Sequence, residues 1–241
     1  MKDTIDKTTR KSLTPNAAFV KMMFGLLVGT LLTALLLFGA AGHLDWPLGW
    51  LFVAVWALLK LIFIILLRWH FPDLMVERAT RHENTQRYDR VIIPIYFVMA
   101  YGTIALAGLD GGRFRWSGDL PLVVIILAYV IYLFGNFLAS WAIHANAFFS
   151  SESRLQTDRN QTVTRSGPYR YVRHPAYLAA TILWPATGPM LESWWAVIPG
   201  LLAALMMFIR TVYEDHMLQN ELPGYKQYAQ SVRYRLFPKI W

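Results

Sequence analysis

Residues 17–41 read AAFVKMMFGLLVGTLLTALLLFGAA, an apolar run with a single charge. A helix needs about 20 apolar residues to cross the hydrocarbon core of a bilayer, and this run is long enough. Comparable runs occupy residues 46–67, 91–109, 120–145, 176–191 and 194–212. The run at 176–191 is shorter and is broken by Pro185, Gly188 and Pro189. We therefore expect an all-α, polytopic helical bundle with six membrane-spanning helices, or five.

The composition supports an integral membrane protein. Of the 241 residues, 56% are hydrophobic and only 16% are charged, which is unusual for a soluble domain. No cysteine is present, so disulfides and cysteine-ligated metals are excluded. We expect one membrane domain over residues 1–241, with a mainly hydrophobic scaffold in 1–145 and most of the candidate chemistry in 146–241. No soluble region remains that would suit nucleic-acid binding.

Basic residues alternate along the chain in a way that predicts orientation. Lys and Arg are frequent in the N-terminal segment, after the second and fourth apolar runs and in the C-terminal tail, and they are sparse in the other loops. Cytoplasmic loops carry the excess of Lys and Arg in membrane proteins. Both termini are therefore expected on the cytoplasmic side.

The segment 167–177, GPYRYVRHPAY, holds the densest group of polar side chains beside an apolar run. Arg and His are costly wherever they face hydrocarbon, and such clusters mark sites in membrane proteins. Pro175 suits the first turn of a helix because its missing N–H is not needed there. That helix start would offer unpaired N–H groups and a partial positive charge to an anion. The segment predicts an anion-handling pocket at the cytoplasmic surface.

A second group of polar residues follows the last apolar run. Arg210 and Glu214 are four residues apart and would share one helix face. Asp215 and His216 come next, and we expect both to be solvated. After the break at Pro223 and Gly224, the spacing of Tyr225, Tyr228 and Val232 predicts a short helix.

These two groups together resemble the superfamily of isoprenylcysteine carboxyl methyltransferases and phospholipid methyltransferases, in a bacterial branch. The matching pieces are Gly167-Pro168-Tyr169, Arg173-His174-Pro175-Ala176-Tyr177, Arg210, Glu214-Asp215, Leu218, Gly224-Tyr225 with Tyr228, Val232, Arg235 and Pro238. The resemblance covers roughly the last hundred residues. It departs from the family at Asp215, where a second Glu is usual. The resemblance implies S-adenosylmethionine as methyl donor, a cofactor pocket facing the cytoplasm, and an entrance for a lipophilic substrate from the bilayer. It also implies a bacterial inner-membrane location.

For the cofactor, the resemblance and the side-chain chemistry suggest distinct roles. His174 and the helix start would receive the methionine carboxylate, and Glu214 the ribose hydroxyls or the ammonium group. The remaining residues expected at the cofactor are Gln156, Gly167, Tyr169, Pro175 and Tyr177.

For the acceptor, Arg173 or Arg170 would orient a carboxylate through paired hydrogen bonds. Glu214 would serve as base if the acceptor were an amine. Arg210 would either hold Glu214 or face the substrate. Carboxyl O-methylation of an isoprenoid-like or other lipidic carboxylate is the favoured activity. Phospholipid amine N-methylation and thiol S-methylation are alternatives.

Two other classes of protein compete with a methyltransferase. A sterol-reductase-like, NADPH-dependent membrane reductase has a related Arg-His motif, but Pro175 and Ala176 argue against it. A transporter should place ionisable or helix-breaking residues near the bilayer midplane, whereas the charges here gather at one face. The histidines lack ligand spacing, so no metal is expected.

Overall fold

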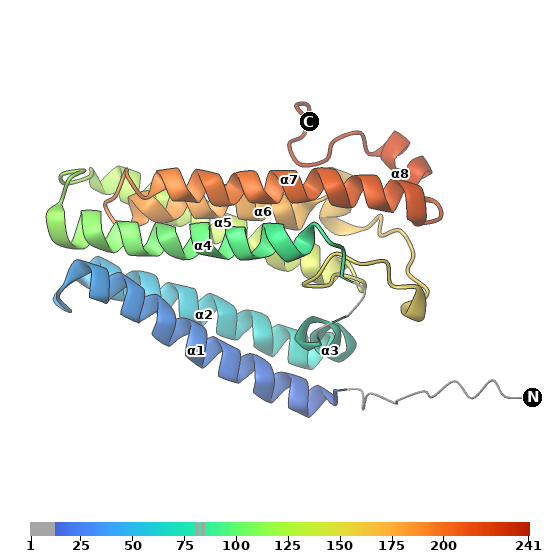
Figure 1. Cartoon of the computed structure of the whole chain (residues 1–241), viewed down its shortest axis with the longest axis horizontal. Helices are drawn as coiled ribbons and strands as arrows, with labels where there is room; N and C mark the ends of the chain where they lie inside the picture. Colours follow the sequence, from blue (N-terminus) through green and yellow to red (C-terminus); the bar gives the residue numbers. More distant parts are fainter. Residues whose placement is uncertain (1–12, 81, 83–84) are drawn as a thin grey trace, which may run out of the picture.

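The computed structural model describes residues 13–80, 82 and 85–241, and these residues form helices and no strands. The N-terminal basic residues (Lys2, Lys7, Arg10 and Lys11) and Arg81, used above to predict orientation, lie outside the described residues. Long helices α1 (Pro15–Ala41), α2 (Pro47–His70), α4 (Asp89–Ala107), α5 (Leu122–Ala145) and α7 (Val197–Glu221) run along the bundle, as Figure 1 shows. The predicted all-helical bundle is confirmed.

Among the described residues, five helices are long and apolar enough to cross a membrane. One of them, Asp89–Phe114, joins α4 to the π-helical turn Gly108–Phe114. The span expected over residues 176–191 corresponds to α6 (Pro175–Met190), whose 16 residues are about 24 Å long at 1.5 Å per residue. This is shorter than a hydrocarbon core of about 30 Å. The expectation that Pro185 breaks this helix is wrong, because α6 continues through Pro185 and Pro189 to Met190.

Local sequence signals explain how α1 begins and ends. The Thr14 hydroxyl accepts a hydrogen bond from the Ala17 N–H at 3.3 Å, and Pro15 occupies the first turn. At the other end Gly42 takes a left-handed conformation (φ 79°), and its N–H donates to the Phe38 carbonyl. These caps satisfy backbone groups that the apolar helix leaves unpaired.

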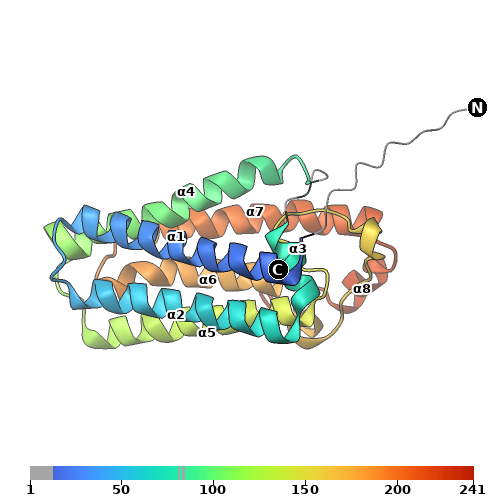
Figure 2. The same ribbon diagram turned by 90° about the horizontal axis from the view of Figure 1, so that it is seen from below.

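Helix α6 packs between α5 and α7, and α4 packs against α7 (Figures 1 and 2). Helices α1 and α2 pair with each other, and α1 also contacts α4. The largest buried cluster, which includes Leu37, Phe52, Ile104 and Met190, joins these groups. At Gly111 the π-helical turn approaches the chain so closely that a Cβ would lie 1.9 Å from the Leu191 carbonyl oxygen.

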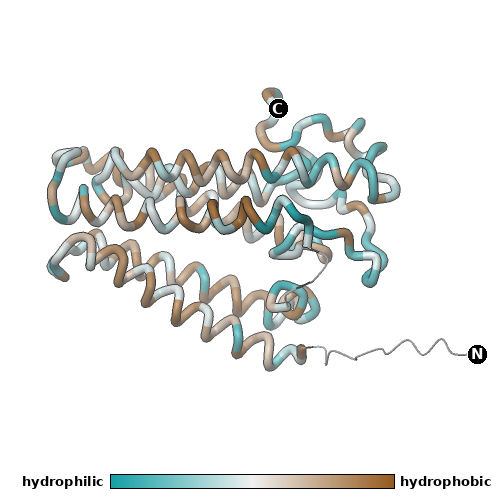
Figure 3. Tube along the Cα trace, viewed as in Figure 1, coloured by the Kyte–Doolittle hydropathy of each residue, from teal (hydrophilic) through white to brown (hydrophobic). Residues whose placement is uncertain are grey.

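Two short helices lie at one end of the bundle. Helix α3 (Pro72–Ala79) was not expected from the sequence, whereas α8 (Tyr225–Ser231) confirms the predicted short helix. The start of α1, the C-terminus and α8 lie toward this same end (Figure 1). Hydrophilic residues also gather there, while the long helices are mainly hydrophobic (Figure 3). This polar end of the bundle contains the candidate site.

Candidate functional site

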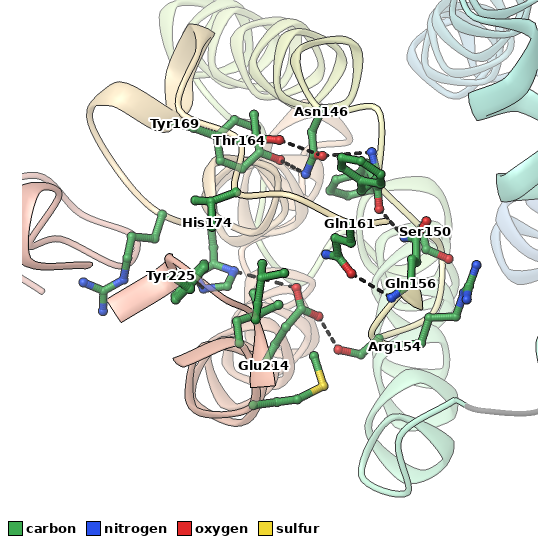
Figure 4. Close-up of a pocket in the computed structure, with 18 of the residues that line it drawn as sticks. Asn146, Ser150, Arg154, Gln156, Gln161, Thr164, Tyr169, His174, Glu214 and Tyr225 are labelled. Atoms are coloured by element: carbon green, nitrogen blue, oxygen red, sulfur yellow. Dashed lines mark hydrogen bonds and ion pairs between the residues drawn. The ribbon is translucent and has the colours of Figure 1, made fainter. Parts of the chain in front are cut away.

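The loop between α5 and α6 is closed by Asn146, the residue that follows α5. Its side-chain oxygen accepts hydrogen bonds from the Phe148 N–H and the Thr164 hydroxyl, both at 3.0 Å. Its amide nitrogen donates to the Tyr169 hydroxyl at 3.3 Å. Burial raises the pKa of Tyr169 above its ordinary value, so this phenol stays protonated. Asn146 therefore fixes three points of the loop around one cavity (Figure 4).

Arg173 and Asp215 form a buried, bidentate ion pair between the loop and α7. Arg173 Nε donates to Asp215 Oδ1 at 2.8 Å, and Nη2 donates to Oδ2 at 2.9 Å. Arg173 Nη1 donates to the carbonyls of Val232 and Arg233, both at 3.0 Å. The expectation that Asp215 is solvated is therefore wrong, because its side chain is fully buried under its partners. Arg173 lines the cavity, but its donors are already taken by the protein, and this disfavours the expected contact with an acceptor carboxylate.

The C-terminal tail is joined to the same ion pair. Arg235 Nε donates to Asp215 Oδ2 at 2.8 Å, and the Tyr225 hydroxyl donates to Oδ1 at 3.0 Å. The backbone N–H groups of Arg173 and His174 donate to the carbonyls of Tyr234 and Arg235, both at 2.9 Å. The tail thus holds the Arg-His segment in place. Tyr225 is buried and points inward, rather than acting as a membrane-interface anchor.

His174 lies between the two adjacent acidic residues of α7. Its Nε2 is 3.3 Å from Asp215 Oδ1, and its Nδ1 is 3.9 Å from Glu214 Oε1. The ring stacks on Tyr177 with centroids 5.6 Å apart and an interplanar angle of 7°. Pro175 begins α6, as its sequence position predicts. His174 and Glu214, which are forty residues apart in sequence, therefore meet at one wall of the cavity.

Glu214 faces the cavity with 18% of its side chain exposed, whereas its neighbour Asp215 is fully buried. One Glu214 oxygen accepts hydrogen bonds from the Tyr177 hydroxyl at 2.8 Å and from the Ser153 hydroxyl. Two neutral hydroxyls orient this carboxylate. Among the described residues, its other oxygen accepts no hydrogen bond and has His174 Nδ1 at 3.9 Å. It can therefore receive a cation or a pair of hydroxyls from a ligand.

Arg210 does not pair with Glu214, which corrects one of the two roles expected for it. Its Nε and Nη2 donate to the two carboxylate oxygens of Asp89, both at 2.7 Å, across the contact between α4 and α7. The guanidinium also lies 5.0 Å from the centre of the Tyr177 ring. Asp89 accepts a further hydrogen bond from the Ser153 N–H at 2.7 Å. Asp89 and Ser153 were missed because neither belongs to a recognisable motif.

The cavity at this end holds about 720 Å³ of space, including open solvent at its mouth. Six of the predicted residues line it: Gln156, Tyr169, Arg173, His174, Tyr177 and Glu214. Four predicted residues do not line it: Gly167, Arg170, Pro175 and Arg210. Arg170 is exposed at the end of the turn Gly167–Arg170, Pro175 begins α6, and Arg210 pairs with Asp89.

Gln156 has a structural function inside the loop. Its amide nitrogen donates to the Phe148 carbonyl at 2.5 Å, and its amide oxygen accepts from Arg159 Nη1 at 2.7 Å. Arg154, another lining residue, donates to the buried Glu77 at 2.9 Å and to Asp158 at 2.7 Å. The Arg154 guanidinium also lowers the pKa of Asp158, so this pair stays charged. The two arginines that line the cavity are thus both neutralised by carboxylates.

The described residues contain no group of three or more His, Asp or Glu side chains placed to hold a metal ion. The wall of the cavity instead combines two partly exposed carboxylates, Glu152 and Glu214, with aromatic side chains and neutral amides. Phe148, Phe149 and Tyr225 supply rings, and Gln161 supplies an amide. Such a lining suits an organic ligand that carries a positive charge and a flat ring system.

Comparison with known proteins gives two findings. Residues 123–223 match the model of the phospholipid methyltransferase family, which confirms the resemblance seen in the sequence. The cobalt-zinc-cadmium resistance protein CzcN of Cupriavidus metallidurans is 30% identical over 141 residues, which cover 57% of this chain and 60% of that protein. The family match begins in α5 and ends just before α8, so it includes His174, Glu214 and Asp215.

Proposed function

We propose that the chain is a membrane methyltransferase. The match to the phospholipid methyltransferase family over residues 123–223 and the helices long enough to span a bilayer support this proposal. The chain uses S-adenosylmethionine and methylates a lipophilic acceptor that reaches the cavity from the bilayer. Its site lies on the cytoplasmic side of a bacterial inner membrane, with both termini on that side. The observation that carries the proposal is the cavity wall where His174, Tyr177 and Glu214 meet.

The residues of this wall suit S-adenosylmethionine by charge and by shape. Glu214 offers the free side of a carboxylate to the cofactor ammonium or its ribose hydroxyls. His174 and the start of α6 lie on the same wall and suit the methionine carboxylate. Phe148, Phe149 and Tyr225 are the rings available to the adenine.

The cofactor supplies an activated methyl group on a sulfonium. The protein's part is to place the acceptor in line with that group and to exclude water. Tyr177 and Ser153 hold Glu214 beside this position. A carboxylate acceptor would need no base from the protein, because it would carry no proton to remove. With an amine acceptor, Glu214 is the lining carboxylate best placed to take the proton.

Carboxyl O-methylation of an isoprenoid-like or other lipidic carboxylate is the activity that we favour. N-methylation of a phospholipid amine and S-methylation of a thiol use the same cofactor pocket. The assay incubates the purified full chain with S-adenosylmethionine labelled in its methyl group and with extracted bacterial lipids, and then measures label in the organic phase. Base-labile label indicates an ester, and base-stable label indicates an amine or a thioether.

The proposal predicts that S-adenosylmethionine binds to the purified protein and that NADPH does not. Binding of NADPH without S-adenosylmethionine would instead favour a membrane reductase. Transport of a solute by reconstituted protein that binds neither compound would favour a transporter. Either result would overturn the proposed function.

A further inference from the structure

Arg78, on helix α3, is partly exposed, but two of its guanidinium nitrogens are buried. Among the described residues, nothing accepts a hydrogen bond from its Nε or Nη1 atoms, and both atoms are shielded from solvent. The guanidinium carbon lies 5.6 Å from the centre of the Phe63 ring and 5.2 Å from that of Phe149. Two phenyl rings thus hold the cation in place and supply no hydrogen-bond acceptor.

This arrangement differs from that of the other arginines near the cavity. Arg154, Arg173 and Arg210 each have a carboxylate partner, in Glu77, Asp215 and Asp89 respectively. A buried charge is normally paired, because removing it from water is unfavourable. Burial is also the main reason that the pKa of Arg78 falls to about 10, and the nearby charge of Arg210 lowers it further. The folded protein therefore keeps an unsatisfied cation, which is expected where a ligand supplies the anion.

Arg78 lies between the lipid-facing helix α2 and the cavity. Phe63 belongs to α2, whereas Phe149 lines the cavity. The backbone of Arg78 is also tied to the site, since the Ser151 hydroxyl donates to its carbonyl at 3.4 Å and the Ser151 carbonyl accepts from Arg210 at 3.3 Å. A molecule moving from the bilayer around α2 toward the cavity would pass this guanidinium.

A second nitrogen without a hydrogen-bond partner in the described part of the chain belongs to a ring that contacts Phe63. His144, near the end of α5, contacts Phe63 with centroids 5.7 Å apart, and its Nε2 atom is buried without a partner among the described residues. Lys60, one turn before Phe63 on α2, is near enough for its charge to act on Arg78. Because His144 Nδ1 donates to the Ser140 carbonyl at 2.7 Å, Nε2 of the neutral ring is an acceptor, and the unsatisfied donors beside Phe63 are those of Arg78.

We propose that Arg78 binds the anionic group of the methyl acceptor, a carboxylate or a phosphate attached to an apolar chain. In the described part of the chain, its buried Nε and Nη1 atoms each have a free N–H for an oxygen of such a group. These two N–H groups point to different sides of the guanidinium, so a paired contact with two oxygens would use Nε together with Nη2. The apolar chain would then remain on the bilayer side, along α2. This inference deepens the proposed function, on which it rests, by making the acceptor an anionic amphiphile.

The test measures binding of three probes with the same alkyl chain to the detergent-purified full chain by native mass spectrometry. The probes are hexadecanoate, dihexadecyl phosphate and the neutral hexadecan-1-ol. The wild-type protein should prefer an anionic probe over the alcohol by about tenfold or more, as expected for charge-assisted hydrogen bonds. The better anion identifies carboxylate or phosphate as the natural group. Arg78→Gln should lose the preference, and Arg78→Lys, which keeps the charge but not the fork, should keep only part of it.

Arg87→Gln is the matched control, because Arg87 is exposed in the segment between α3 and α4. It should retain the wild-type preference. The thermal midpoint of Arg78→Gln should fall only slightly, because the variant loses two cation–π contacts but, among the described residues, no internal hydrogen bond or ion pair. The inference would be overturned if wild type showed no preference for an anionic probe over the alcohol, or if Arg78→Gln kept that preference unchanged. A large fall in the thermal midpoint of Arg78→Gln would also overturn it. Binding of S-adenosylmethionine is measured in parallel, so loss of the proposed function would be recognised separately.

Discussion

Replacing Asp215 with Asn should separate the C-terminal tail from the rest of the site. Asp215 is fully buried and accepts hydrogen bonds from Arg173, Tyr225 and Arg235. Asparagine has nearly the same shape, but it is neutral and offers N–H groups where an acceptor is required. The substitution therefore leaves the buried guanidinium of Arg173 facing a donor.

The size of the effect follows from this geometry. Removing one partner of a buried ion pair destabilises a protein by about 3–5 kcal/mol, because the other charge remains buried. For a chain of this length, about 1 kcal/mol shifts the thermal midpoint by roughly 2–4 °C. Asp215→Asn should therefore lower the midpoint by roughly 6–20 °C.

The midpoint is measured in detergent from tryptophan fluorescence, and trypsin digestion reports on the tail. In the variant, cleavage after Arg233 and Arg235 should accelerate, because the backbone bonds between the tail and residues 173–174 are weakened. Glu221→Gln is the control, since Glu221 is an exposed acid at the end of the same helix. Equal midpoints and equal cleavage rates in the two variants would refute the assignment of Asp215 as the residue that holds the tail.

Two further predictions test other parts of the structure. Gly111→Ala should lower the thermal midpoint by an amount equivalent to about 1–3 kcal/mol or more, because the added Cβ would meet the Leu191 carbonyl oxygen. Gly25→Ala is the control and should not lower the midpoint, because open space surrounds Gly25. Equal effects of the two substitutions would contradict the close approach at Gly111. Burial raises the pKa of Tyr228 above its ordinary value, so the folded state holds the phenol proton more tightly than the unfolded state does. The stability that this group contributes to the folded state is therefore lost as pH rises above about 10, the ordinary pKa of tyrosine. The fall in midpoint between pH 8 and 10.5 should be smaller in Tyr228→Phe than in wild type, and identical falls would show that this group does not contribute.

The sequence predicted the long helices well because a 20-residue apolar run has few other stable arrangements. It missed α3 because an eight-residue helix has too few turns to show a clear period. The buried face of α3 (Leu74 and Met75) packs in a cluster with residues of α1. The length of α6 was nearly correct, but the effect of Pro185 was not, since neighbouring helices support the chain on both sides.

The site was predicted less completely, because adjacent residues on a helix point in different directions. Glu214 and Asp215 are chemically similar, and nothing in their spacing shows which one faces the cavity and which one is buried. The partner of Arg210 was expected four residues away, yet the structure selects Asp89, 121 residues away in sequence. Spacing along one helix predicts local pairs, but only the packing of α4 on α7 brings these two charges together.

The most direct test of the account is calorimetric titration of S-adenosylmethionine into the wild-type protein and into His174→Ala, Glu214→Ala and the control Glu221→Gln. The wild type and the control should bind with the same affinity. The two site variants should each lose about 1.5–3 kcal/mol of binding free energy, the range for hydrogen bonds to charged groups. Equal affinity in all four proteins, or no binding to the wild type, would contradict the claim that the wall formed by His174 and Glu214 holds the methyl donor.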